Sequence, residues 1–208
     1  MIEAALRARR SVRCFKPDSV PEDLILRLLE GAITAPSASN KQPWKFLVVT
    51  RGELIRQMAE AVRGATARIS LHIPESSRAA FLAYGDYFTR FEAAPVVLVP
   101  TYKPLCILSN LTADTLPAVD RDGIEQLEQS SGLIGTALAL ENLLLLAEEL
   151  GLGASGMTGP LVARAELKQL LEVPPTWDIL ALVPLGYPAE KPAPTPRKAV
   201  HFVTRWFR

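Results

Sequence analysis

The most apolar segment of the chain places the strongest constraint on its fold. This segment, LIGTALALENLLLLA, spans Leu133–Ala147 and carries Glu141 and Asn142. It is shorter than the roughly 18 to 20 apolar residues that a helix needs to cross a bilayer. We therefore predict a buried core helix over about 124–150 and no membrane span. Because buried polar side chains need partners, we expect Glu141 and Asn142 to hydrogen-bond across a helix–helix contact, with a functional role as the alternative.

Composition indicates a globular protein with one core. The chain has 208 residues, of which 49% are hydrophobic and 22% charged, so a single domain over 1–208 is expected. Its 23 basic and 22 acidic side chains give a formal net charge of +1, which provides no general attraction for nucleic acid or an anionic membrane. The N-terminal sequence MIEAALRARRSVR lacks the apolar stretch of a secretory signal, and we expect a cytoplasmic location.

Side chains that commonly bind metals are scarce. Cys14 and Cys106 are too few for a zinc-finger ligand set and leave a single disulfide as an alternative. His72 and His201 have no metal-ligand spacing. We therefore predict no metal site and a structural role for both histidines.

Short runs rich in β-branched residues alternate with helical patterns. The predicted strands are 44–50, 96–101 and 179–186, with an extended piece at 11–15, and the predicted helices are 2–10, 52–63, 78–91, 124–150, 161–172 and one from Pro21 to a point before Pro36. Strands separated by helices indicate a sheet flanked by helices, of α/β or α+β type. Segments 63–74 and 102–123 show no clear period and are expected to be loops or a lid. The five prolines within 184–196 predict an extended arm.

Four arginines within seven positions concentrate positive charge in a nearly neutral chain: Arg7, Arg9, Arg10 and Arg13. Guanidinium groups offer forked donors, and Ser11 in their midst adds a hydroxyl, a combination that suits a phosphate. The alternative is structural, because arginines at the C-terminal end of a helix offset the negative end of its dipole. Charge alone does not separate the two interpretations.

The loop Ala35–Pro43, with sequence APSASNKQP, is bracketed by prolines and rich in amide and hydroxyl groups. Such side chains supply both donors and acceptors, which a heterocycle with alternating carbonyls and ring nitrogens requires. A plain turn has a similar composition. Considered alone, the loop favours the plain turn.

Residues 151–156, GLGASG, satisfy the dinucleotide-binding pattern G-x-G-x-x-G by letters. That pattern functions between a strand and a helix N-terminus, whereas a predicted helix precedes it here. We therefore reject a Rossmann site and interpret Gly151 as a helix C-cap, followed by glycines that let the backbone approach a flat ligand. No nucleophile elbow or P-loop lysine is present, so neither a serine hydrolase nor an NTPase is indicated.

In their order along the chain, these segments resemble the nitroreductase family of flavoproteins. The resemblance rests on Arg9-Arg10-Ser11-Val12-Arg13 and on Ala35–Phe46, APSASNKQPWKF, with weaker support from Leu150–Gly153, Gly156–Pro160, Gly186-Tyr187-Pro188 and Pro196-Arg197. The first two motifs together are specific. The resemblance covers nearly the whole chain except about 63–123.

The resemblance implies an α+β fold with a central, mostly antiparallel sheet flanked by helices, in an interlocked homodimer with one FMN in each of two interface sites. One subunit is implied to contribute Arg9, Arg10, Ser11, Arg13, Gly156, Met157, Thr158, Gly159 and Arg197. The other subunit is implied to contribute Pro36, Ser37, Ala38 and Asn40. In this arrangement the arginines hold the phosphate, ribityl chain and ring edge, while 156–159 face the flavin near N5 and O4. Segment 63–123 is then a variable lid or substrate region, and 184–208 a C-terminal arm.

The implied activity is ping-pong hydride transfer from NADH or NADPH, through flavin N5, to an electron-poor acceptor such as a nitroaromatic or a quinone. No catalytic side chain is implied, because the flavin carries the chemistry. The alternative is a flavin-binding protein of the same fold with a specialised role, as a sensor or carrier or in heterocycle oxidation or dehalogenation. Five aromatic residues either line a substrate pocket or belong to the core: Phe81, Tyr84, Tyr87, Phe88 and Tyr102. A nucleic-acid-binding module is disfavoured, since basic charge is confined to one segment.

Overall fold

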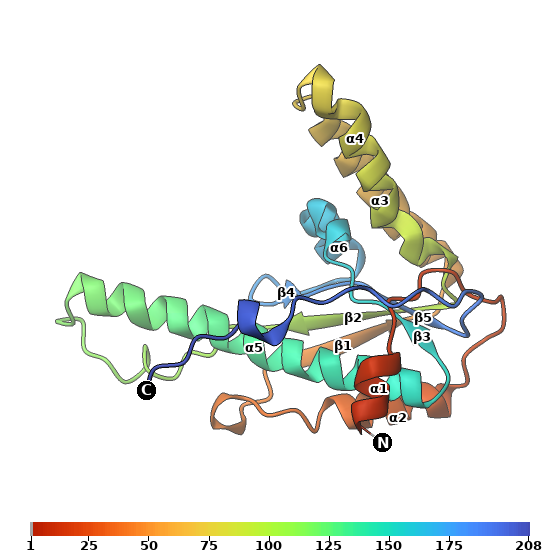
Figure 1. The fold of residues 1–208 in the computed structure, drawn as a ribbon. Coiled ribbons are helices and arrows are strands. Elements are labelled where there is room, and N and C mark those ends of the chain that lie inside the picture. Colours follow the sequence, from red (N-terminus) through yellow and green to blue (C-terminus); the bar gives the residue numbers. More distant parts are fainter. Residues whose placement is uncertain (1) are drawn as a thin grey trace.

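A five-stranded sheet organises the fold in the computed structural model, which describes residues 2–208 (Figure 1). The strands are β1 (Trp44–Val49), β2 (Val96–Tyr102), β3 (Gly153–Ala154), β4 (Asp178–Ile179) and β5 (Val183–Gly186). Their order is β1-β2-β5-β3, and β4 also pairs with β2. Each of these pairings is antiparallel. The predicted α+β sheet flanked by helices is confirmed.

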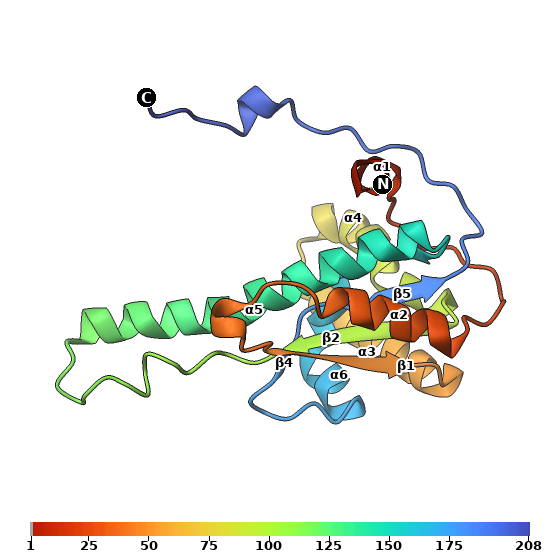
Figure 2. The same cartoon turned by 90° about the horizontal axis from the view of Figure 1, so that it is seen from below.

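Apolar side chains cover both faces of the central strand β2. Each residue of Val96–Val99 is buried, as expected for a strand between two helical layers. One face packs against α2 (Glu22–Ala32) and α5 (Ala118–Glu149), and the other against α3 (Gly52–Ser70) and α6 (Arg164–Leu170), as Figures 1 and 2 show. The sheet therefore separates two hydrophobic cores.

The helix predicted over 52–63 is longer than expected. It is α3, which continues to Ser70 because its buried face continues through Ala65 and Thr66. α4 (Glu75–Gly85) and the 3-10 helix η2 (Asp86–Ala93) follow, so that α3 and α4 form a hairpin projecting from the sheet (Figure 1). The expectation of a loop over 63–74 is therefore wrong for most of that segment.

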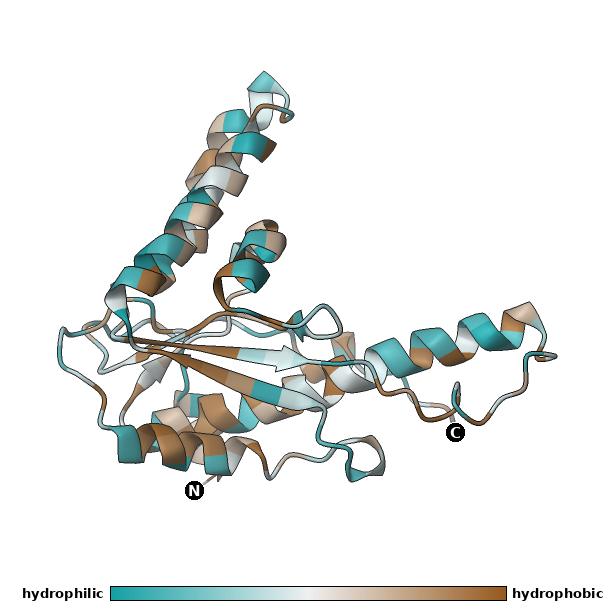
Figure 3. Ribbon diagram, turned by 180° about the vertical axis from the view of Figure 1, so that it is seen from behind, coloured by the Kyte–Doolittle hydropathy of each residue, from teal (hydrophilic) through white to brown (hydrophobic). Residues whose placement is uncertain are grey.

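The long helix α5 begins earlier than predicted, at Ala118, so the expectation of a loop over 102–123 is wrong for 118–123. The helix is only partly buried. Its second half is the predicted core helix, with Ala139, Leu143 and Ala147 fully buried. Three apolar side chains on the same helix are exposed in the single chain: Leu133, Ile134 and Leu138. Its first half extends beyond the sheet, with hydrophobic and hydrophilic residues alternating along it (Figure 3). α5 is long and apolar enough to cross a membrane, a property that core helices of soluble proteins share.

Other boundaries differ less from prediction. α1 spans Ile2–Ala8, and the helix predicted over 161–172 is divided between the 3-10 helix η3 (Gly159–Ala163) and α6. The strand predicted over 179–186 is divided into β4 and β5, which pair with different parts of β2. β3 has no counterpart in the prediction, because two residues within a glycine-rich segment show no alternation.

The C-terminal arm is extended, as its prolines predict. After β5 it passes α1 and then runs away from the rest of the chain, with only the short 3-10 helix η4 (Val200–Phe202) along it (Figure 2). The apolar side chains exposed near its end are Val200, Phe202, Val203, Trp206 and Phe207. Nothing in residues 2–208 covers them.

Candidate functional site

The arginine-rich segment, residues 7–13, runs from the end of α1 to the edge of the sheet. Ser11 forms a parallel bridge with Ala154 of β3, and the Val12 N–H donates to the Ala154 carbonyl at 3.2 Å. A Cβ at Gly153 would lie 2.7 Å from Cγ1 of Val12, so this glycine permits the approach. The space at Gly153 thus accommodates Val12 rather than the flat ligand expected from the glycine pattern. Gly151 has φ +73° directly after α5, which confirms the predicted C-cap.

Arg10 caps the helix that precedes it. Its Nη1 donates to the carbonyl oxygens of Arg7 at 2.7 Å, Ala8 at 2.9 Å and Arg9 at 2.8 Å. These carbonyls lie at the C-terminal end of α1, where the helix leaves such groups without partners. Arg10 therefore has the structural role that the sequence analysis gave as the alternative to phosphate binding, because it stabilises the C-terminal end of α1.

Arg9 has different surroundings, because its side chain points toward α5. Nε of Arg9 lies 3.5 Å from Oε1 of Glu141, and this nitrogen is buried without a hydrogen-bond partner. The Glu141 side chain is about half exposed, so the expectation of a buried Glu141–Asn142 pair is wrong for Glu141. Asn142 does reach across the contact with α2, with Nδ2 3.4 Å from Oγ1 of Thr34.

A cavity of about 360 Å³ lies between the arginine-rich segment and the C-terminal arm. Its lining residues are Leu6, Arg7, Arg9, Arg10, Ser11, Pro194, Thr195 and Arg197. Four guanidinium groups and no carboxylate line it, a composition that suits an anion with several oxygens. The fold thus brings Arg197 beside Arg9, Arg10 and Ser11. We call this space the arginine cavity.

Glu190 anchors the arm to the same segment, and no sequence pattern singled it out. Its Oε1 accepts hydrogen bonds from the backbone N–H groups of Arg13, at 2.7 Å, and Cys14, at 3.0 Å. The Arg13 N–H contributes most to holding the pKa of Glu190 below its ordinary value of 4.5, although burial opposes this. Glu190 is therefore a carboxylate under ordinary conditions.

A second, smaller cavity of about 180 Å³ lies beside Arg13. Its lining residues are Arg13, Tyr84, Tyr87, Phe88, Gly156, Met157, Thr158, Gly159 and Pro160. Met157 is fixed by reciprocal backbone hydrogen bonds of 2.9 Å with Leu182. The fold therefore brings Arg13 together with all four residues of the predicted segment 156–159. We call this space the aromatic cavity.

One buried polar atom next to this segment has no partner. The Oγ atom of Ser155 is buried and makes no hydrogen bond within residues 2–208, like Nε of Arg9 in the arginine-rich segment. Such groups are rare in proteins, because an unpaired buried donor or acceptor costs free energy. Both atoms belong to segments that line the two cavities or adjoin them.

The loop that carries Pro36, Ser37, Ala38 and Asn40 lines neither cavity. It packs against α5, where a Cβ at Gly135 would lie 3.4 Å from Cβ of Ser37. The loop is tightly wound, with φ values of +49° at Ser39 and +50° at Asn40. It is held by the Gln42 N–H, which donates to Oγ of Ser37 at 2.9 Å. Within one chain, these predicted residues are thus not brought together with the arginines.

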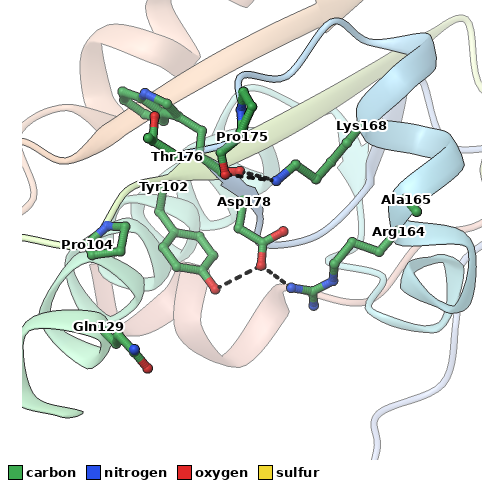
Figure 4. Close-up of a pocket in the computed structure, with 10 residues that line it drawn as sticks. Tyr102, Pro104, Gln129, Arg164, Ala165, Lys168, Pro175, Thr176 and Asp178 are labelled. Carbon is green, nitrogen blue, oxygen red and sulfur yellow. Dashed lines mark hydrogen bonds and ion pairs between the residues drawn. The ribbon is translucent and has the colours of Figure 1, made fainter. Parts of the chain in front are cut away.

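The structure divides the five aromatic residues of the middle segment. Tyr84, Tyr87 and Phe88 line the aromatic cavity, whereas Tyr102 lines another cavity of about 560 Å³ near α6. Phe81 of α4 is partly buried and lines neither cavity. Figure 4 shows that the polar groups there pair with one another: Asp178 binds Arg164 and the Tyr102 hydroxyl, and Nζ of Lys168 donates to the Trp177 carbonyl at 2.5 Å. Burial, followed by the Asp178 charge, raises the pKa of Tyr102. Because these groups satisfy one another, they have a structural role.

Metal-binding and disulfide chemistry find no support in the part of the chain that the structure describes. Within residues 2–208, no three side chains of the His, Cys, Asp and Glu types come together as a metal site. Cys14 and Cys106 are both exposed and unpaired, so the disulfide alternative is not realised.

Comparison with known proteins identifies the family of this chain. Residues 6–187 match the nitroreductase family. The chain is 33% identical to a protein of Thermus thermophilus named NADH dehydrogenase, over 98% of this chain and 94% of that protein. The chain therefore belongs to the nitroreductase family, and the names of its relatives place it among oxidoreductases.

Solved structures show the same fold. A BluB-like flavoprotein of Clostridium difficile superposes with a TM-score of 0.85 and 23% identity, over all of this chain and 99% of the other. An FMN- and NADPH-dependent nitroreductase of a Sphingopyxis strain superposes with a TM-score of 0.72 and 21% identity, over all of this chain and 99% of the other. At this level of identity, the two structures establish the fold.

Proposed function

We propose that this protein is an FMN-dependent oxidoreductase, which takes hydride from NADH or NADPH and passes electrons to an electron-poor acceptor such as a nitroaromatic or a quinone. The observation that carries the proposal is the adjacency of the two cavities along one segment. Arg9 and Ser11 line the arginine cavity, and Arg13, two residues further on, lines the aromatic cavity. This arrangement suits a ligand with a phosphate at one end and a flat ring at the other.

The residues present fit FMN on chemical grounds. The arginine cavity offers Arg9, Arg197 and the Ser11 hydroxyl to a phosphate. Nε of Arg9 is buried without a hydrogen-bond partner, and the Glu141 carboxylate 3.5 Å away holds the guanidinium beside the cavity. Arg10 is partly engaged in capping α1, so we assign it a smaller share of the binding than the sequence alone indicated.

The protein's own contribution to the reaction is binding and electrostatics. When bound, FMN accepts hydride and passes electrons to the acceptor, so no catalytic side chain or metal is needed. The Arg13 guanidinium places positive charge at the aromatic cavity, where it favours additional negative charge on a ring. Backbone N–H groups of Gly156, Thr158 and Gly159 provide neutral donors on the same side, whereas the Met157 N–H is bonded to the Leu182 carbonyl.

We propose a homodimer in which each flavin site takes residues from both subunits. Ser37 packs on Gly135 of α5, close in sequence to the exposed Ile134 and Leu138. Burying that face against a second copy would remove apolar surface from water and carry Pro36, Ser37, Ala38 and Asn40 toward the partner's arginines. The exposed apolar end of the arm would be covered in the same way.

In this proposal residues 1–208 form one domain, with 63–123 containing the substrate-facing part and 184–208 the arm, in a cytoplasmic protein. The small-molecule acceptor would enter beside the flavin, and neither nucleic acid nor a membrane would be a partner. Within one chain, the part of 63–123 that lines the aromatic cavity is the end of α4 and the start of η2, with Tyr84, Tyr87 and Phe88.

Subunit mixing tests the shared site directly. Arg9→Ala and Asn40→Ala would each damage both sites of a homodimer, so each variant alone should lose FMN binding. After the two are unfolded and refolded together, half of the dimers should be mixed and carry one intact site, which restores about a quarter of all sites. Recovery near this fraction supports the shared site, whereas no recovery would show that each site lies within one subunit.

A specialised flavoprotein is the second candidate, favoured by the small volume of the aromatic cavity. A sensor, a carrier, a heterocycle oxidase or a dehalogenase would bind FMN at the same residues. It would differ in failing to turn over nitroaromatics and quinones with either nicotinamide nucleotide. Steady-state assays with both nucleotides and a panel of acceptors distinguish the two candidates.

A further inference from the structure

We propose that Tyr84 and Tyr87 form the acceptor-binding wall of the site and select planar aromatic acceptors that carry a negative charge. This inference rests on the proposed function, because it places the acceptor beside a bound flavin. It assigns acceptor specificity to two residues of segment 63–123, which carries none of the family motifs.

The wall is rigidly attached to the segment expected to face the flavin. Phe88 of η2 is buried, with 7% of its surface exposed, and it occupies the space where Gly159 would carry a side chain. A Cβ at Gly159 would lie 2.3 Å from Cδ1 of Phe88. Any larger residue at Gly159 would therefore separate the two segments. Phe88 thus fixes the position of its neighbours in the wall.

Tyr84 and Tyr87 are more exposed than aromatic side chains that only pack in a core. Tyr84 is 65% exposed and Tyr87 is 46% exposed, yet both line the aromatic cavity. The Tyr84 ring meets the Phe88 ring edge to face, with centroids 5.1 Å apart and planes at 80°. Aromatic faces held in place in this way offer a stacking surface to a planar ligand.

The net charge at the wall is positive. Arg13 is the only residue in the cavity lining, as the structure describes it, that carries a formal charge at neutral pH. The Arg90 guanidinium lies over the Tyr87 ring, 4.1 Å from its centroid, and adds a second positive charge. Asp86 and Arg90 both belong to η2, lie outside the cavity lining and carry opposite charges, so the net positive charge at the wall is that of Arg13. An acceptor with a carboxylate or a phenolate is therefore favoured over a neutral one.

The test measures binding rather than turnover. The FMN-loaded protein in the oxidised state is titrated with 4-nitrobenzoate and, separately, with nitrobenzene, and the change in flavin absorbance gives each Kd. The variants are Tyr84→Ala, Tyr87→Ala, their Phe counterparts and Arg90→Gln. The control is Leu82→Ala, which alters an exposed residue of α4 outside the cavity lining.

We expect each tyrosine-to-alanine change to weaken 4-nitrobenzoate binding about three- to tenfold, with the phenylalanine variants close to wild type because the ring is kept. Arg90→Gln should reduce the preference for the anionic probe and leave nitrobenzene binding unchanged. The Leu82→Ala control should match wild type.

Two different failures are distinguishable. Wild-type protein that retains no flavin bands after addition of FMN and removal of unbound FMN would overturn the proposed function, and this inference with it. Flavin-loaded tyrosine variants that bind both probes as tightly as wild type would overturn the inference alone. Equal affinity of the wild type for the two probes would refute the selection for negative charge.

Discussion

The Glu190 carboxylate accepts a 2.7 Å hydrogen bond from the backbone N–H of Arg13, a residue 177 positions earlier in the chain. This contact joins the arm that carries Arg197 to the segment that carries Arg9 and Ser11. The two sides of the arginine cavity are therefore held together by a residue that does not line it. We infer that Glu190 positions the site without contacting its ligand.

Replacing Glu190 should weaken flavin binding through this positioning. Glu190→Ala leaves the N–H groups of Arg13 and Cys14 without their acceptor, and we expect the FMN Kd to rise about tenfold. Fluorescence titration of FMN with the purified variant gives the Kd. Glu190→Gln keeps one acceptor oxygen and should show a smaller effect. Glu60→Gln, on the exposed face of α3, serves as the matched control, and an equal effect there would remove the special role of Glu190.

Arg197 should matter more than another arginine on the same arm. Arg197→Ala removes a charged donor from the arginine cavity, so FMN binding should weaken by about 1.5–3 kcal/mol, or roughly ten- to a hundredfold. Arg205→Ala should have little effect, because Arg205 stacks over Phe207 outside the cavity. Equal Kd values for the two variants would mean that the phosphate site is elsewhere.

Two glycines of α5 provide a matched pair for stability. A Cβ at Gly132 would lie 2.0 Å from the Lys103 carbonyl oxygen, so Gly132→Ala should lower the free energy of unfolding by about 1–3 kcal/mol. Gly123 has open space around it, and Gly123→Ala should raise this free energy by up to about 1 kcal/mol through helix propensity. Chemical denaturation of both variants measures the difference. If both alanines stabilise the protein, the close crossing of α5 by the segment after β2 is wrong.

Glu128, one turn of α5 before Gly132, holds the segment after β2 in place. This buried carboxylate accepts backbone hydrogen bonds from Ile107 at 2.6 Å, Leu108 at 2.7 Å and Ser109 at 3.1 Å. Burial alone would raise its pKa, but donation by Ser109 and its neighbours outweighs burial and holds the pKa below the ordinary 4.5. We expect Glu128→Gln to destabilise the fold by about 1–3 kcal/mol at neutral pH.

The sign of the pH dependence follows from this lowered pKa. Between the folded and unfolded pKa values the unfolded chain binds more protons, so stability rises with pH in that range. The contribution of Glu128 is complete above about pH 4.5 and is lost as the pH falls through the folded pKa. The gap in unfolding free energy between wild type and Glu128→Gln should therefore narrow below pH 4.5. A gap independent of pH would mean that the charge on Glu128 contributes nothing.

The sequence predicts those parts of this protein that depend on neighbouring residues. Gly151 is recognisable as a C-cap because the apolar helix pattern ends just before it. The covered strand β2 is recognisable because its apolar run is continuous. In contrast, the helical part of 63–74 is missed, since the buried face of α3 packs largely against η2, η3, α4 and α6, all of which lie later in the chain.

Long-range contacts mark the limit of sequence reasoning at the site. Nothing in the residues around Glu190 or Glu128 indicates which backbone N–H groups they bind. The sequence also cannot show that Arg9 and Arg10 have different roles, because they are adjacent and chemically alike. Only the fold shows that Arg10 caps α1 while Nε of Arg9 remains without a hydrogen bond.

The central claim is that a bound flavin at these cavities accepts electrons from a nicotinamide nucleotide. The most direct measurement is the visible absorption spectrum of the FMN-loaded protein before and after anaerobic addition of NADH or NADPH. We predict flavin bands that bleach with at least one nucleotide and return when an acceptor such as 4-nitrobenzoate is added. Flavin bands that persist with both nucleotides, or protein that binds no FMN, would contradict the account.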